Sequence, residues 1–335
     1  MVLKTAVIGC GRIGCGFDDD PLRKIVSTHA GAYSKNPKTK LDALCDIDTN
    51  KLNMYGKKYS VTNLFTNVDE LLEQVKPDLL SVCTLPDQHE EITIKAAKAG
   101  VKGIFCEKPI SNNIVSAKHM IDVCEKNGVV LMIDHQRRFD PLFSSIKLAL
   151  QQSLLGKIYQ NTFYYTAGIY NTGTHMIDLM RYFFGDIEWV IGIHSSAKSS
   201  NTDDPNIDGL LKFKNGMLSS IHALDVKDYL VFEEDVLGSK GRLRILNNGS
   251  EVEYHTIIDS KNFSGYTELQ ETHLPFELPK EREYMMEGIN HLVSCVENGI
   301  KPVSSGHDGL NALEALIALV KSADDESKKV YLPLE

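Results

Sequence analysis

The first half of the chain alternates short apolar runs with amphipathic segments, and this alternation constrains the fold more than any other feature. The apolar runs, which we expect to form buried strands, are residues 2–8, 41–45, 79–83, 103–106 and 129–133. The amphipathic segments, which we expect to form helices, are residues 69–75, 90–99 and 116–126. Strands that alternate with helices build a parallel sheet covered on both faces, and right-handed crossovers make such a domain doubly wound.

A different pattern begins near residue 140. Asp140 and Pro141 open a helix that extends to about residue 152. Strand-like stretches follow at residues 157–166, 187–195, 207–212, 217–224 and 229–237, with turn residues at 240–242 and 247–250 and closing helices near 283–298 and 307–323. Consecutive strands predict an α+β domain with an open, largely antiparallel sheet. We therefore expect an α/β chain with two domains, residues 1–130 and 131–335.

Composition narrows the classes of partner. The chain has 335 residues, with 36 Lys and Arg against 45 Asp and Glu, which gives a net charge of −9. Nucleic acids and anionic membranes recruit basic surfaces, so neither is an expected partner. No run approaches the ~18 apolar residues of a membrane span. The first apolar run leads directly into a glycine loop, so it is not a signal peptide.

The cysteines favour a cytoplasmic location. There are seven, no Cys-x-x-Cys pair occurs, and several lie within the apolar runs. We expect free thiols that act as small core residues in a reducing compartment. No cluster of potential ligands has the spacing of a zinc site, so no metal is expected.

A glycine-rich hexapeptide follows the first predicted strand: Gly9-Cys10-Gly11-Arg12-Ile13-Gly14. Glycine is needed in such a loop for a tight turn, for the approach of backbone to a pyrophosphate, and for close packing of helix on strand. A merely structural turn could have the same composition. The position of the loop, at the start of a strand–helix alternation, favours a dinucleotide-binding Rossmann domain over residues 1–130.

Asp46, at the end of the second predicted strand, bears on the choice of dinucleotide. A carboxylate there accepts hydrogen bonds from the ribose hydroxyls of NAD and would repel the 2′-phosphate of NADP. We therefore expect NAD, with NADP possible. The alternative is an aspartate that caps the following helix.

The spacing of Asp46 indicates an insertion. Asp46 stands 32 positions after Gly14, where about 20 is usual. The excess is residues 15–28, and we expect the first helix to start at Ser27 or Thr28. The insertion contains three consecutive aspartates, 18–20, which should point away from a pyrophosphate. Two roles stay open for it, a solvated loop and a lid over the active-site cleft.

Several further motifs occur in one order along the chain. They are Thr84 to His89, Glu107-Lys108-Pro109, Gln136-Arg137-Arg138-Phe139-Asp140-Pro141, Gly173-Thr174-His175 with Asp178, and the turns at 238–241 and 305–309. Together they resemble the Gfo/Idh/MocA oxidoreductases, whose signature is Glu-Lys-Pro. The resemblance covers nearly the whole chain, and the joint order of the motifs is more specific than any one of them.

The resemblance implies a cofactor site and an assembly. The residues expected to bind the cofactor are Gly9, Gly11, Arg12, Ile13, Gly14, Asp46, Thr84, Leu85, Pro86, His89, Glu107, Lys108, Gln136 and Arg138. In this family the sheet of the second domain commonly forms the dimer interface, which implies a homodimer or homotetramer here.

The resemblance assigns the chemistry to Lys108 and His175. The family's lysine lies beside the nicotinamide ribose and the substrate hydroxyl, so Lys108 is expected to hydrogen-bond the reacting oxygen and stabilise alkoxide charge. The imidazole of His175 titrates near neutral pH, which suits proton exchange with a sugar hydroxyl. The alternatives are a surface lysine that caps a turn and a structural histidine.

Four more residues are expected to contact the substrate: Asn171, Asp178, Tyr164 and Tyr170. Asp178 lies one helical turn beyond His175, where it could orient the imidazole or make a buried contact. The tyrosines could instead pack within the sheet. Asn171 departs from inositol-dehydrogenase-like members, which have an aspartate at this position, and an amide cannot polarise His175 as a carboxylate would.

The leading hypothesis is an NAD(P)-dependent dehydrogenase or reductase that acts on a sugar, a polyol or a nucleotide-linked sugar. The insertion and Asn171 favour an activated or amino sugar over a plain inositol. A second hypothesis is a non-catalytic, dinucleotide-sensing regulator of the same fold. A third is a glycosidase that uses NAD transiently.

Overall fold

The computed structural model describes residues 2–199 and 201–334, which form two compact units. The first consists of the chain up to Pro141 together with Lys280–Leu313, and the second of Leu142–Pro279 together with the chain from Glu314. This division differs from the predicted 1–130 and 131–335, because the chain returns to the first unit late in the sequence. The returning helix, α8 (Tyr284–Asn298), packs on strand β5 (Gly103–Cys106) and on helix α1 (His29–Lys35).

Glycines allow α8 to lie close to the first sheet. A Cβ atom on Gly103 would stand 2.8 Å from Val296 and 3.1 Å from Leu292, and one on Gly288 would stand 3.0 Å from the ring of Phe105. Larger residues at these positions would push the helix away from the strand. The close approach explains why residues 280–313 belong to the first unit.

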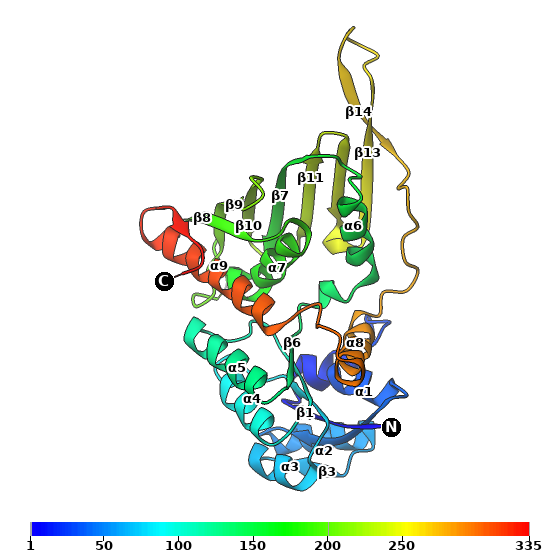
Figure 1. Cartoon of the computed structure of the whole chain (residues 1–335), viewed down its shortest axis with the longest axis vertical. Helices are drawn as coiled ribbons and strands as arrows, with labels where there is room; N and C mark the ends of the chain where they lie inside the picture. The colour runs from blue at the N-terminus through cyan, green and yellow to red at the C-terminus, as the bar shows by residue number, and fades with distance from the viewer. Residues whose placement is uncertain (1, 200, 335) are drawn as a thin grey trace. The chain divides into compact units, whose positions relative to one another are not determined.

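The first unit contains a six-stranded parallel sheet with the order β3-β2-β1-β4-β5-β6 (Figure 1). The strands not yet given are β1 (Leu3–Ile8), β2 (Thr39–Cys45), β3 (Asn63–Phe65), β4 (Leu79–Val82) and β6 (Val130–Ile133). Five match the predicted strands, and the three-residue β3 was missed. The order reverses between β1 and β4, and ligands of doubly wound sheets bind beyond the carboxyl ends of the strands at such a point.

Local sequence explains the helices of this unit. They are α1, α2 (Thr49–Tyr59), α3 (Val68–Val75), α4 (His89–Lys98), α5 (Ile114–Lys126) and α8. Side-chain oxygens of Thr28, Asp48, Asn67 and Asn113 accept backbone N–H groups at the starts of α1, α2, α3 and α5, and each such cap contributes about 1 kcal/mol.

The second unit contains a nine-stranded, mostly antiparallel sheet with the order β14-β13-β12-β11-β7-β10-β9-β8-β15. Only the β7–β10 pair is parallel among the pairings of the described residues. The strands are β7 (Ile158–Thr166), β8 (Ile187–His194), β9 (Ile207–Phe213), β10 (Leu218–Leu224), β11 (Phe232–Gly238), β12 (Gly241–Leu246), β13 (Glu251–Asp259), β14 (Thr267–Thr272) and β15 (Val330–Tyr331). The predicted fold class is confirmed.

One face of the second sheet is buried and the other is exposed. Along β7, Phe163 and Tyr165 are fully buried, whereas Tyr164 between them is exposed. Helix α7 (Gly173–Phe184) lies on the buried face, because a Cβ atom on Gly173 would stand 3.5 Å from the ring of Tyr165. The other helices that supply residues to this unit are α6 (Pro141–Gln151) and α9 (Gly306–Asp324).

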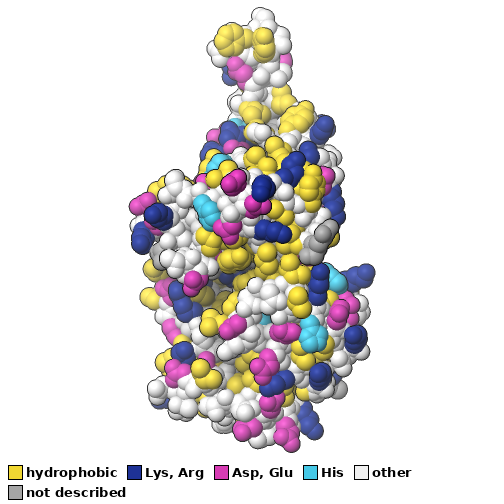
Figure 2. Space-filling model, turned by 90° about the vertical axis from the view of Figure 1, so that its left-hand side faces the viewer, with side chains coloured by type: hydrophobic (Ala, Val, Ile, Leu, Met, Phe, Trp, Pro, Cys, Tyr) yellow, Lys and Arg dark blue, Asp and Glu magenta, His cyan; other side chains and the backbone are white. Residues whose placement is uncertain are grey.

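Strands β13 and β14 form a long hairpin at one edge of the sheet (Figure 1). Hydrophobic side chains stand at its tip (Figure 2), where Phe263 and Tyr266 are exposed. Among the described residues, no helix has the length and apolar character needed to cross a membrane. All seven cysteines are buried free thiols, as predicted.

Candidate functional site

The glycine loop joins β1 to a single helical turn, Arg12–Gly16. A Cβ atom on Gly9 would stand 2.5 Å from the carbonyl oxygen of Cys83, and one on Gly14 would stand 1.9 Å from the carbonyl oxygen of Gly9. Both glycines are therefore required by the protein's own packing. A Cβ atom on Gly11 would meet no heavy atom within 4 Å, so the space beside Gly11 is open to a ligand such as a pyrophosphate.

The side chains of Arg12 and Ile13 point in different directions. The Arg12 guanidinium lies 4.7 Å from the centre of the Phe17 ring, and that of Arg23 lies 3.9 Å from the same ring. Ile13 packs against the core of the first unit. The side chain of Ile13 is therefore turned to the core, and Ile13 can offer only its backbone to a cofactor. The side chain of Arg12 is exposed and offers a positive charge.

Asp46 ties the end of β2 to the glycine loop. Its Oδ2 accepts a hydrogen bond from the backbone N–H of Cys10 at 2.6 Å, and its Oδ1 accepts one from the N–H of Asp48 at 2.8 Å. The helix-capping alternative is wrong, because Asp48 is the residue that caps α2. A carboxylate has about four lone pairs, so Asp46 keeps acceptor capacity for ribose hydroxyls.

Replacement of Asp46 by asparagine is expected to weaken the preference for NAD over NADP. The amide keeps an acceptor for the loop but removes the charge that would repel a 2′-phosphate. The ratio of the two dissociation constants should change about tenfold, or ~1.4 kcal/mol. Titration of both dinucleotides by tryptophan or nicotinamide fluorescence measures the ratio, with Asp42→Asn on the same strand as the control. An unchanged ratio would contradict the ribose assignment.

The insertion folds against its neighbours. Asp18 accepts hydrogen bonds from the backbone N–H of Ser27 at 2.7 Å and from the hydroxyl of Thr28. Thr28 caps α1, which begins at His29, one residue after the later of the two predicted starts. Asp19 accepts a hydrogen bond from the hydroxyl of Tyr55 on α2 at 3.0 Å. The first two aspartates therefore attach the insertion to α1 and α2, so a freely solvated loop is not an adequate description.

The loops after β4 and β5 are joined by a buried histidine. His89 is fully buried, and its Nδ1 lies 3.2 Å from the carbonyl oxygen of Pro109 while its Nε2 lies 3.2 Å from that of Thr84. Burial lowers the pKa of the His89 imidazole. Both ring nitrogens of His89 therefore face backbone carbonyls of the two loops, and contact of His89 with a cofactor stays a prediction. Thr84, Leu85 and Pro86 are at least partly exposed.

Glu107 also points inward. Its side chain is largely buried, with Oε1 3.1 Å from Nε2 of His29 and Oε2 accepting the backbone N–H of Lys108 at 3.3 Å. Burial, and next the carboxylate of Asp134, raise the pKa of Glu107 to about 7. The carboxylate of Glu107 is thus engaged with His29, and contact of Glu107 with the cofactor stays a prediction. Lys108 is half-buried.

Arg138, in the segment after β6, also directs its side chain inward. The Arg138 guanidinium is buried, donates to the carbonyl oxygen of Val303 at 2.7 Å and forms an ion pair with Asp308 at 3.0 Å. Arg138 therefore connects this segment to the start of α9, and its contact with a cofactor stays a prediction. Gln136 is partly exposed and stays a candidate.

In the second unit, an acidic residue that sequence reasoning missed shapes the backbone before His175. Asp204 is 8% exposed and accepts hydrogen bonds from the backbone N–H groups of Tyr170 at 2.6 Å and Asn171 at 3.0 Å. A Cβ atom on Gly168 would stand 2.3 Å from the Asp204 carboxylate. Asp204 thus fixes the turn that leads into α7.

The predicted substrate residues of the second unit separate into two groups. His175 is half-buried at the start of α7, Asn171 is exposed, and Tyr170 is half-buried, with a pKa raised by burial and then by Asp204. Asp178 is 1% exposed, and its contact with the substrate stays a prediction. Tyr164 stacks on His222 with ring centres 5.5 Å apart, on the sheet face opposite α7, and its contact with the substrate stays a prediction.

Comparison with known proteins identifies the family. Residues 3–135 match the model of the oxidoreductase family's NAD-binding Rossmann fold, and residues 166–332 match that family's C-terminal alpha/beta domain. The chain belongs to the Gfo/Idh/MocA oxidoreductase family. It is an NAD-binding oxidoreductase of α/β fold, as predicted.

Relatives match along nearly the whole chain. The chain is 28% identical to a myo-inositol 2-dehydrogenase from Thermotoga maritima, with 97% of each chain covered. It is 24% identical to a D-apiose dehydrogenase from Paraburkholderia graminis, with 93% of this chain and 86% of the relative covered. A crystal structure of the WlbA dehydrogenase from Bordetella pertussis, in complex with NADH and UDP-GlcNAcA, has the same fold, with a TM-score of 0.80, 21% identity and all of both chains covered.

Proposed function

We propose that this protein is an NAD-dependent dehydrogenase or reductase that interconverts a CH–OH group and a ketone on a sugar or polyol. One observation carries the proposal. The carboxyl ends of β1, β4 and β5, which are neighbours in the sheet, present the open space at Gly11, the exposed loop at Thr84 and the Lys108 loop along one edge. A dinucleotide that crosses this edge would have its pyrophosphate at Gly11 and its reactive end toward Lys108.

The residues of the chain would supply positioning and proton transfer. When bound, the nicotinamide accepts or gives a hydride at C4, and this is the only chemistry that the cofactor contributes. In oxidation, the carbinol C–H bond breaks with its electron pair and the hydroxyl proton leaves to a base. Lys108 would hold the reacting oxygen by a hydrogen bond, and His175 would exchange the proton. Asn171 would hydrogen-bond a substrate hydroxyl without polarising His175.

The relatives support a polyhydroxylated substrate, because they are named as dehydrogenases of D-apiose and of myo-inositol. The exposed face of the second sheet supports assembly into a homodimer or homotetramer through hydrophobic side chains such as Tyr164, Leu210 and Leu218. A cytoplasmic location stays a prediction, which cell fractionation would check.

A screen of nicotinamide absorbance tests the function. Purified protein would be mixed with NAD or NADP and a panel of inositols, aldoses, ketoses and nucleotide sugars, in both reaction directions. Turnover on one class is expected, with NAD preferred. Tight NADH binding without turnover on any class would overturn the proposal in favour of a sensing protein, and release of a sugar without net NADH would favour a glycosidase.

A further inference from the structure

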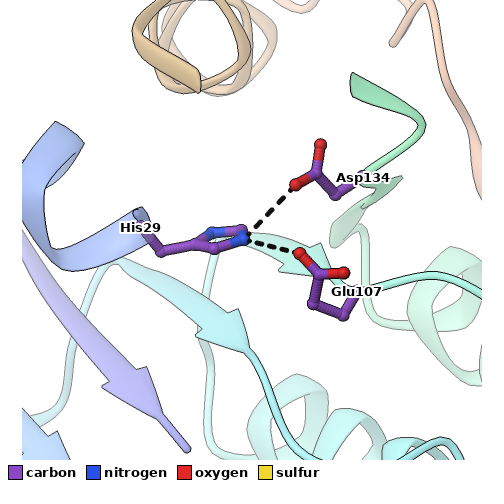
Figure 3. Close-up of side chains that lie close together, drawn as sticks. All are labelled: His29, Glu107 and Asp134. Carbon is purple, nitrogen blue, oxygen red and sulfur yellow. Dashed lines mark hydrogen bonds and ion pairs between the residues drawn. The ribbon is translucent and has the colours of Figure 1, made fainter. Parts of the chain in front are cut away.

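A buried cluster of three titratable side chains includes Glu107, the residue that precedes Lys108. His29, Glu107 and Asp134 come from the start of α1 and from the carboxyl ends of β5 and β6, and their side chains converge (Figure 3). Nε2 of His29 lies 3.1 Å from Oε1 of Glu107 and 3.5 Å from Oδ2 of Asp134. None of the three is more than 7% exposed. The proposed function assigns no role to this cluster.

The other side of the imidazole is also occupied. Nδ1 of His29 lies 2.8 Å from the hydroxyl of Ser81, which donates to the hydroxyl of Tyr33 at 3.0 Å. Ser81 can therefore accept from Nδ1–H while Nε2–H points at Glu107. The ring of Phe105 packs edge-on against His29, with the centres 4.9 Å apart. The imidazole is held in one orientation by groups from three strands.

Charge balance favours a cationic imidazole. Two carboxylates without a counter-charge would be costly in a buried site. Burial disfavours the imidazolium, but the sulfur of Cys83 and the carboxylates of Asp134 and Glu107 outweigh it and raise the pKa of His29 well above its ordinary value. Burial also raises the pKa of the Cys83 thiol, so we assign the stabilisation of the cation to the carboxylates.

The cluster reaches Lys108 through Glu107. The two oxygens of Glu107 are divided between His29 and the backbone N–H of Lys108. The Lys108 cation lowers the pKa of Glu107, and this interaction is mutual, so an ionised Glu107 favours the protonated form of Lys108. The state of His29 therefore influences both the position and the charge of Lys108.

The insertion sets where His29 stands. Thr28 caps α1, and Asp18 of the insertion accepts both the Thr28 hydroxyl and the backbone N–H of Ser27. His29 is the first residue of α1. Through these bonds, residues 15–28 help to fix the position of His29.

We propose that His29 is a positioning residue of the active site, which favours the ionised form of Glu107 and thereby holds Lys108 in place and favours its protonated form. The inference deepens the proposed function, because it rests on the proposed role of Lys108. The hydrogen-bond distance from Nε2 to Glu107 supports direct bonding among the three side chains rather than a shared metal ion.

The test measures the titration of Lys108 without any substrate. Trace labelling of the protein with acetic anhydride over a range of pH, read by mass spectrometry of the peptide that contains Lys108, gives its pKa. In His29→Gln the amide can still donate to Glu107 but has no charge. Glu107 should then stay protonated to higher pH, and the pKa of Lys108 should fall by about one unit. His119→Gln, which removes the exposed partner of Glu90 at 2.8 Å, is the matched control and should change nothing.

A double-mutant cycle tests the route through Glu107. Glu107→Gln alone should lower the pKa of Lys108, and His29→Gln should cause no further fall in that background. An unchanged Lys108 titration in a folded His29→Gln protein, or equal falls in both backgrounds, would overturn the proposal. If His29→Gln does not fold, an unchanged titration in Glu107→Gln overturns it alone.

Two further measurements separate the alternatives. A stoichiometric metal in the purified protein, found by elemental analysis and lost in His29→Gln, would overturn the hydrogen-bonded account. Once a substrate is known, the pH dependence of kcat/KM can be measured. The part of this profile that reflects the titration of Lys108 should move to lower pH in His29→Gln. If no substrate is turned over, the proposed function fails, whereas the labelling result still decides the inference about His29.

Discussion

Replacement of Lys108 by alanine is expected to reduce kcat/KM about 10²–10⁴-fold while the affinity for NADH changes little. The reason is that the proposed contact of its ammonium with the reacting oxygen strengthens as alkoxide charge develops, and such contacts affect the transition state more than binding. Steady-state kinetics on the substrate found by the screen, together with fluorescence titration of NADH, measure the two quantities.

Two companions make the Lys108 result specific. Lys98→Ala removes an exposed lysine of α4 in the same unit and should leave turnover unchanged. Lys108→Arg keeps a cation but holds its proton more tightly, and its planar head differs in shape, so it should restore little activity. Turnover by Lys108→Ala at the wild-type rate would contradict the assigned role.

Replacement of Gly11 by alanine is expected to weaken NADH binding at least tenfold without loss of stability. The backbone of Gly11 has φ −72°, which alanine adopts readily, and the added methyl group would meet no protein atom within 4 Å. That methyl group would instead occupy the space where the pyrophosphate approaches the loop. Calorimetric titration with NADH and thermal unfolding of the free protein measure the two effects.

Gly14, the last glycine of the same loop, is the natural comparison, because its replacement should affect stability as well as binding. Gly14→Ala would place a carbon 1.9 Å from the carbonyl oxygen of Gly9, so it should lower the unfolding temperature of the free protein as well as NADH affinity. If Gly11→Ala binds NADH as tightly as the wild type, the dinucleotide is not at this loop.

The features of the fold that depend on local sequence pattern are predicted well from the sequence. The strand–helix alternation predicts five of the six strands of the first sheet, and β3 was missed because three residues carry too little periodicity. The glycine loop was predicted because backbone geometry demands glycine at particular positions, and the start of α1 was predicted to within two residues.

Motifs predict which residue occurs but not where its side chain points. His89, Glu107 and Arg138 stand at the expected positions, yet each directs its polar atoms inward to the loops and ion pairs that support the site. Likewise, the tyrosine motif alone does not say which face of the sheet Tyr164 occupies, because alternation along β7 sends neighbouring side chains to opposite faces.

Long-range packing explains the remaining differences. Asp204 bonds a backbone N–H group 33 positions earlier in the chain, and α8 returns to a strand that precedes it by more than half the chain. One signal for the buried cluster was present in the sequence. Glu107 and Asp134 each follow the last residue of adjacent predicted strands, and the carboxyl ends of parallel strands meet at one edge.

The central claim is hydride transfer between a carbinol carbon and NAD, and isotope transfer tests it most directly. The protein would be incubated with NAD and a substrate from the screen that carries deuterium on the carbinol carbon, and the recovered dinucleotide would be analysed by mass spectrometry and NMR. The account predicts one deuterium at C4 of the nicotinamide in NADH, formed by the wild type and much more slowly by Lys108→Ala. Oxidised product with no deuterium in NADH would contradict direct transfer.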